Sequence, residues 1–177
     1  YENITGLRLL NGTDTIIQND IHNNNLNSFE GGGIYCSRNT AIIKNNNIYD
    51  NKANIGAGIY LEKSDSSIIL GNQIHSNTGI WGGGIACFES KVVIDSNEIK
   101  NNFATEIGGG VYTHLDSVIL KRNLIMSNTS NWYGGGIYGN GETFAGSNLI
   151  VNNIADFGGG CYFQANNYLT NNTISKN

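Results

Sequence analysis

Apolar residues along this chain come in short segments that are rich in isoleucine, valine and tyrosine and are separated by glycine and asparagine. Each segment is too short for a helix, and β-branched and aromatic residues favour strands, so the pattern predicts many short β-strands. One strand follows each glycine cluster, and another is a β-branched run that recurs at residues 42–43, 68–70, 92–94 and 118–120.

Two motifs repeat in phase along nearly the whole chain. The first is a glycine cluster followed by an apolar residue and usually tyrosine, and it starts at residues 31, 56, 82, 108, 134 and 158. The second is N-x-I-x-x-N, which starts at Asn19, Asn46, Asn72, Asn97, Asn123, Asn148 and Asn172. A fixed period of this size indicates a solenoid, because one repeat cannot bury its apolar side until neighbours stack on it. The sequence therefore predicts a single all-β domain over residues 1–177, a parallel β-helix of about seven coils with about 25 residues per coil.

Alternation of side chains gives each strand an inward and an outward face. The first inward column after the glycines is predicted to be Ile34, Ile59, Ile85, Val111, Ile137 and Cys161. The second is predicted to be Cys36, Leu61, Cys87, Thr113, Gly139 and Phe163. The cysteines thus substitute for larger core residues. Cys36 and Cys87 lie two coils apart, about 9.6 Å at the spacing of paired strands, which exceeds disulfide reach. We therefore expect free, buried thiols.

Glycine and asparagine are predicted to shape the corners of each coil. The glycines indicate a bend whose backbone conformations are closed to residues with a side chain. The first asparagine of N-x-I-x-x-N is predicted to occupy the left-handed region at another corner, since asparagine tolerates that region. Stacked asparagine side chains are also expected to bond along the column, as they do in cross-β stacks.

The coupling of G-G-G-I-Y with N-x-I-x-x-N resembles the parallel β-helix repeat superfamily, and most of all polymorphic outer-membrane-protein and adhesin-like surface proteins. Repeats of that kind also carry an N-x-A element, which is matched by Asn51-Lys52-Ala53, Asn102-Phe103-Ala104 and Asn153-Ile154-Ala155. The resemblance implies a right-handed solenoid and an extracellular or cell-surface location. The same superfamily includes polysaccharide lyases, pectin-type hydrolases, epimerases and carbohydrate-binding stalks, so the fold alone does not select a function.

Composition narrows the partner classes. Charged residues make up 14% of the chain, and its polar character comes from 30 asparagines. The net charge of −4 is too small to indicate a nucleic-acid or membrane-surface partner. The chain contains no run of 18 apolar residues, so no membrane span is predicted. No signal peptide is visible, and a chain that starts at Tyr1 is expected to be a mature product or a fragment.

The first candidate site is the outward column of the strands that follow the glycines, interrupted by Ala86. Its members are Tyr35, Tyr60, Tyr112, Tyr138 and Tyr162. Regularly spaced, exposed aromatic faces can stack on the sugar rings of a glycan or dock a partner surface. The alternative is that the rings simply stack on one another across coils, as aromatic residues of neighbouring strands do.

The second candidate site is a ridge of acidic residues in the turn after the tyrosine strand. Its members are Asp65, Glu89, Asp116 and Glu142, which precede the next motif asparagine by 6–8 residues. Carboxylates about 5–10 Å apart suit either a glycosidase pair or Ca²⁺, the one cofactor that the sequence suggests. The alternative is a set of solvated turn acids paired with Lys63 and Lys91.

Other residues point less clearly to chemistry. His114 lies beside Asp116 on the outward column that contains Glu62, where a lone histidine is usually part of an ordinary surface. Because no acid, base and nucleophile converge in the pattern, no catalytic residue is assigned. The residues immediately before the glycines are predicted to pack over the edge of the core. They are Glu30, Ile55, Trp81, Ile107, Tyr133 and Phe157. Trp132 is predicted to be exposed.

These observations favour a non-enzymatic extracellular module, structural or adhesive, such as a surface stalk or a filament subunit. No polar cap is visible at either end of the repeat, which suggests a longer chain or copies that stack end to end. The alternative function is a carbohydrate-active β-helix, with the tyrosine column as its sugar platform and the acidic ridge as catalyst or Ca²⁺ site.

Overall fold

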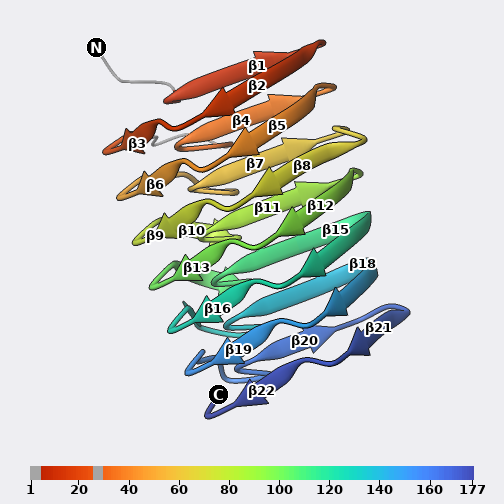
Figure 1. The fold of residues 1–177 in the computed structure, drawn as a ribbon. Coiled ribbons are helices and arrows are strands. Elements are labelled where there is room, and N and C mark those ends of the chain that lie inside the picture. Colours follow the sequence, from red (N-terminus) through yellow and green to blue (C-terminus); the bar gives the residue numbers. More distant parts are fainter. Residues whose placement is uncertain (1–4, 26–29) are drawn as a thin grey trace.

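Parallel strands stacked along one axis form three ladders that run the length of the molecule (Figure 1). The computed structural model describes residues 5–25 and 30–177, apart from the side chain of Asp116. Each coil adds one level to each ladder, so β-strands that are one repeat apart in the sequence lie side by side in space.

The first ladder follows the glycine corner and consists of β1 (Leu7–Leu10), β4 (Ile34–Ser37), β7 (Ile59–Glu62), β11 (Ile85–Phe88), the first part of β15 (Val111–Lys121), the first part of β18 (Ile137–Gly146) and β20 (Cys161–Phe163). The second consists of β2 (Thr13–Ile17), β5 (Thr40–Lys44), β8 (Ser67–Leu70), β12 (Lys91–Asp95), the second parts of β15 and β18, and β21 (Asn167–Thr170).

The third ladder consists of β3 (Asp20–His22), β6 (Asn47–Tyr49), β9 (Gln73–His75), β13 (Glu98–Lys100), β16 (Leu124–Met126), β19 (Leu149–Val151) and β22 (Thr173–Ser175). A short additional sheet precedes the glycines and consists of β10 (Thr78–Trp81), β14 (Phe103–Ile107) and β17 (Thr129–Ser130).

The described residues form strands and turns, with about six turns of the solenoid and about 26 residues per turn. This confirms the predicted all-β parallel β-helix. In the same part of the chain, no helix is long and apolar enough to cross a membrane.

The two predicted inward columns form the core. Ile34, Ile59 and Ile85 are fully buried, and they pack in one cluster with isoleucines from the other two ladders. Burying one such side chain contributes about 1.5–3 kcal/mol. The cysteines are free as predicted, with Cys36 and Cys87 buried and Cys161 half-buried.

The glycine corner is crowded by the next coil. The first glycine of each cluster has a positive φ, as at Gly82 with φ of 65°. The third is excluded from carrying a side chain for a different reason, because a Cβ on Gly84 would lie 2.5 Å from the carbonyl oxygen of Gly110. The positive φ recurs in all six clusters and the close backbone contact in the first five, which explains why glycine persists there.

The two asparagines of N-x-I-x-x-N form two hydrogen-bonded ladders inside the corners. The backbone N and side-chain Nδ2 of Asn46 both donate to Oδ1 of Asn72, at 2.9 and 3.1 Å. Nδ2 of Asn46 also donates to the carbonyl oxygen of Ile16 in the preceding coil, at 2.9 Å. Asn51 repeats this arrangement with Asn77 and Ile21 in the second ladder. Each amide therefore ties three coils together.

The expectation that the motif asparagine itself takes the left-handed conformation is wrong. Positive φ values occur one residue earlier, as at Asn45 with φ of 54° and Ser96 with φ of 55°. This offset turns the following asparagine side chain inward, where it satisfies backbone groups that water cannot reach. The preceding position tolerates varied residues because its own side chain is exposed or only partly buried.

Candidate functional site

The tyrosine column is buried, which corrects the expectation of exposed aromatic faces. Tyr35, Tyr60, Tyr112 and Tyr138 are only 3–6% exposed, and Tyr162 is half-buried. The reason is the glycine corner, where the chain reverses and lays the residue before the first glycine over the ring. That residue is Ile55, Trp81, Ile107 or Tyr133 in four coils, and all pack against the tyrosine cluster. Their predicted position over the core edge is thus corrected to a position over the tyrosines.

The tyrosine rings stack on one another, as the alternative interpretation predicted. The centroids of Tyr112 and Tyr138 lie 5.4 Å apart with an interplanar angle of 16°. Ala86 interrupts the column, and Phe88 fills the gap by contacting Tyr60 and Tyr112 at centroid distances of 6.2 and 5.7 Å. Burial raises the pKa of Tyr35 and Tyr138. The rings therefore offer little free surface to a sugar.

Three of the predicted acidic residues, Asp65, Glu89 and Glu142, occupy slightly different positions of the turn. Glu89 has a positive φ of 47° at the corner, whereas Glu142 lies beside Ser117 in the strand register. Asp65 is an extra residue of its coil and accepts a hydrogen bond from the backbone N of Lys91 at 3.0 Å. Nζ of Lys63 lies 3.7 Å from Glu89 Oε2. The side chain of Asp116 lies outside the described residues.

No group of three or more histidine, cysteine, aspartate or glutamate side chains is placed to hold a metal ion in the part of the chain that the structure describes. His114 is tilted by 40° against Phe88 at a centroid distance of 4.6 Å, and its Nδ1 lies 3.3 Å from Nδ2 of Asn140. The predicted exposure of Trp132 is confirmed at 50%.

Sequence reasoning missed a polar aromatic strip on the third ladder, formed by His22, Tyr49 and His75. Successive ring centroids lie 4.8 and 5.1 Å apart, at interplanar angles of 16° and 9°. Beside the strip, Asn47 Nδ2 donates to Asp20 Oδ1 at 3.0 Å, and Asn47 Oδ1 contacts His75 Nε2 at 3.2 Å. Because the ring faces contact each other, the strip presents ring edges and polar atoms outward. The sequence does carry a sign of this strip. In the first three copies of N-x-I-x-x-N, the residue after the isoleucine is histidine, tyrosine and histidine.

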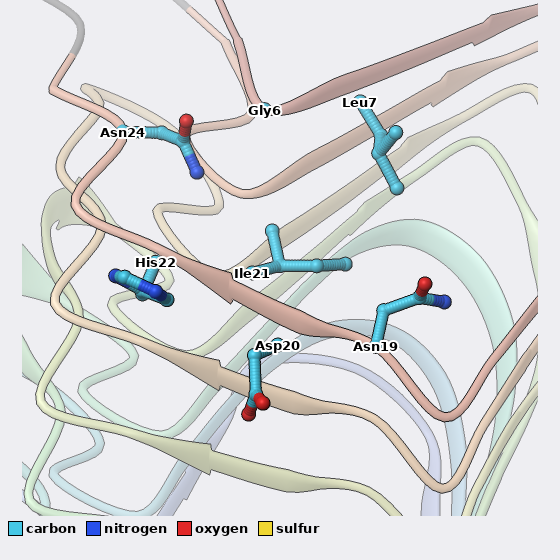
Figure 2. Close-up of a pocket in the computed structure, with 7 residues that line it drawn as sticks. All are labelled: Gly6, Leu7, Asn19, Asp20, Ile21, His22 and Asn24. Carbon is cyan, nitrogen blue, oxygen red and sulfur yellow. The ribbon is translucent and has the colours of Figure 1, made fainter.

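A hollow of about 290 Å³ lies at the β1 end of the solenoid, next to this strip. Figure 2 shows Ile21 and Asp20 leaving β3 in opposite directions, with Ile21 directed toward Leu7. Asn19 and Asn24, the first described members of the two asparagine ladders, also line the hollow, together with Gly6 and His22. The hollow thus combines apolar core with amide groups.

The second missed feature is an exposed apolar column along the second ladder. Its members are Ile42, Ile68, Val93, Ile119, Phe144 and Tyr168, which are directly paired in the strand register. Ile42 is 39% exposed and Ile119 is 41% exposed. The signal was the unbroken β-branched runs, because a strand with successive apolar residues is apolar on both faces.

Comparison with known proteins gives one family. The family described as "Right handed beta helix region" matches residues 1–143. No curated protein and no solved structure matches the chain.

Proposed function

The chain belongs to the right-handed β-helix family, and on that premise we propose that it is a non-enzymatic structural or adhesive module, part of a surface stalk or a filament. Its repeated coils form a rigid rod on the order of 33 Å long for seven levels of strands. The rod holds its outer faces at fixed spacing, and partners bind to those faces.

The observation that carries this proposal is the uniformity of the corners. Among the described residues, all positive φ values except that of Ser66 recur at equivalent corners of successive coils, as at Arg38, Lys63 and Glu89. Unusual backbone conformations often cluster at active sites, but here they repeat along the rod and so belong to the architecture. Glu89 and Glu142, by contrast, occupy different positions of the turn.

The proposed location is extracellular or at the cell surface. The amide ladders support it, because the side-chain hydrogen bonds that tie the coils together form equally well in an oxidising compartment. The thiols of Cys36 and Cys87 are buried, and burial raises the pKa of the Cys36 thiol to about 12. A thiol of that kind resists oxidation, since the thiolate is the reactive form.

Glycan binding without turnover is a second candidate function, favoured by the polar aromatic strip. The edges of His22, Tyr49 and His75, with Asp20 and Asn47, form a row of hydrogen-bonding groups repeated about every 5 Å along the rod. Such a row suits an extended polyhydroxylated chain. In this second candidate function the sugar chain lies on the polar aromatic strip and not on the tyrosine column.

Incubation with neutral and acidic polysaccharides tests the leading proposal. New reducing ends and the ultraviolet absorbance of unsaturated uronates are followed, and neither is expected to increase. Turnover that is lost in Glu89→Gln or Asp116→Asn, and kept in Glu142→Gln, would replace the proposal with a carbohydrate-active enzyme.

Binding to an array of glycans tests the second candidate on the same protein. Tyr49→Ala is expected to remove any binding, whereas Phe157→Ala, at a residue that is 57% exposed in the segment before the glycines, is expected to preserve it. Equal binding by both variants would rule out the strip as the glycan site.

A further inference from the structure

The apolar column is a feature of the outer surface that the proposed function does not explain. Five of its side chains are between 36% and 53% exposed, although they lie directly above one another in consecutive coils. Monomeric proteins rarely leave contiguous apolar surface of this extent uncovered. A straight, flat column of isoleucine and aromatic side chains is well shaped to pack against a second sheet.

A hollow opens on one side of the column, near its β21 end. It measures about 220 Å³ and is lined by Ile119, Lys121, Phe144, Gly146, Tyr168 and their strand neighbours. It exists because Gly146 carries no side chain at a position where the strand register otherwise places one. Phe144 and Tyr168 stack at a centroid distance of 4.8 Å and form its apolar wall.

The two flanks of the column differ in charge. Two residues before the column lie Lys91 and Glu142, together with uncharged polar residues in the other coils. Two residues after it lie Lys44, Asp95 and Lys121. Asp95 is already paired with Lys121, at 3.7 Å, and with Arg122 in its own chain. The second flank is therefore positive on balance.

We propose that the apolar column is the interface with a second copy of this chain, with the two rods side by side and pointing in the same direction. A two-fold axis parallel to the rods would place each column on the partner's column. It would also place the first flank of each copy against the second flank of the other. Glu142 then faces the hollow at Gly146, where its carboxylate can reach Lys121.

The opposite orientation of the rods is disfavoured by charge. A two-fold axis along the strands would place each flank against its own kind, so that Lys91 faces Lys91 and the positive second flank faces itself. Like charges juxtaposed across an interface oppose association. Glu142 would then face the coil of Thr40, and the hollow at Gly146 would stay unfilled.

The size of the face is sufficient for a specific dimer. Seven levels of strands about 4.8 Å apart, each about five residues wide, give a footprint of roughly 530 Å² per copy. Both copies together bury roughly 1,100 Å² on this basis, which just exceeds the size expected of a biological interface. The pairing goes beyond the proposed function, which holds whether or not the rods associate laterally.

Analytical ultracentrifugation over a range of concentrations tests the pairing. The chain is expected to form dimers, and Ile119→Lys should raise the dimer dissociation constant by about tenfold or more. Leu149→Lys is the matched control, because Leu149 is 42% exposed on the third ladder and Ile119 is 41% exposed. A monomer at every concentration, or equal weakening by the two variants, overturns the proposal.

Cross-linking tests the orientation. Ile42→Cys, treated with a short bis-maleimide, should give a covalent dimer, because residue 42 faces its own copy in parallel rods. The unsubstituted chain, which carries two buried cysteines and the half-buried Cys161, sets the background. Cross-linking only in a mixture of Ile42→Cys with Phe144→Cys would show antiparallel rods and overturn the proposed arrangement.

Discussion

Asn97 gives two hydrogen bonds to one atom of Asn123. Its backbone N and its side-chain Nδ2 both donate to Oδ1 of Asn123, at 2.9 and 3.1 Å. Asn123 in turn donates from Nδ2 to the carbonyl oxygen of Ile94 at 2.8 Å and to Asn148. One amide thus satisfies buried groups on both neighbouring coils, which no apolar or purely accepting side chain can do.

Asn123→Ala is expected to destabilise the chain by about 3 kcal/mol or more, because it leaves several buried donors and acceptors without partners. Chemical denaturation followed by circular dichroism measures the loss. Asn166→Ala, at an exposed turn residue, is the control and should change stability by less than about 0.5 kcal/mol. Similar losses in both variants would show that the ladder does not hold the coils together.

Gly84→Ala is expected to be strongly destabilising because the added Cβ lies 2.5 Å from a backbone oxygen of the next coil. We expect a loss of about 3 kcal/mol, at the upper end of overpacking costs. In Gly12→Ala the nearest atom lies 3.5 Å from the added Cβ. That variant should fold as stably as the parent, and a comparison of thermal midpoints distinguishes the two. Unchanged stability in Gly84→Ala would contradict the close packing of the corners.

Tyr112→Ala is expected to cost about 3–5 kcal/mol of stability, since the ring is 4% exposed and stacks between neighbours. Tyr168→Ala removes the same atoms from a ring that is 53% exposed. It should cost less than half as much in urea denaturation. If the two costs are equal, the tyrosine column is not the second packed cluster that the structure shows.

Stability is expected to fall in alkaline solution. Burial, with a smaller contribution from Asp14, raises the pKa of the Cys36 thiol from 9.0 to about 12, and burial raises that of Cys161 to about 12 as well. The folded chain therefore holds these protons more tightly than the unfolded chain. The resulting stabilisation is complete below pH 9 and is lost as the pH rises toward 12.

Denaturation midpoints from pH 8 to 11 measure this loss. A variant with Cys36→Val and Cys161→Val should lose stability less steeply, although the raised pKa of Tyr35 and Tyr138 leaves part of the decline above pH 10. If stability falls equally steeply with pH in the parent and the variant, the thiols do not cause the loss.

The repeat made the fold predictable because each coil repeats the same physical constraints at the same positions. Gly84 allows close packing at a corner, and Asn123 satisfies buried backbone groups. The sequence shows both roles because glycine and asparagine recur at the same positions in successive repeats. The burial of Tyr112 was not predictable from alternation, which describes only one strand and its two faces. A second layer covers that strand, and it is formed by the segment before the glycines, which includes Trp81 at the end of β10.

The outer faces were missed for a related reason. Val118 and Ile119 are adjacent and equally apolar, so the sequence indicates that both faces of the strand are apolar. It does not indicate which parts of the outward face remain exposed to solvent. The acidic residues illustrate the opposite error. Asp65 and Glu89 are close to the same offset in sequence, yet the extra residue of one coil places them at different points of the turn.

Immunogold electron microscopy of intact source cells tests the central claim most directly, with antibodies raised against this chain. The account predicts gold on the outside of the cell, aligned along stalks or fibres, before any permeabilisation. Label confined to the cytoplasm, or to dispersed soluble particles with no extended structure, would contradict a structural or adhesive role outside the cell.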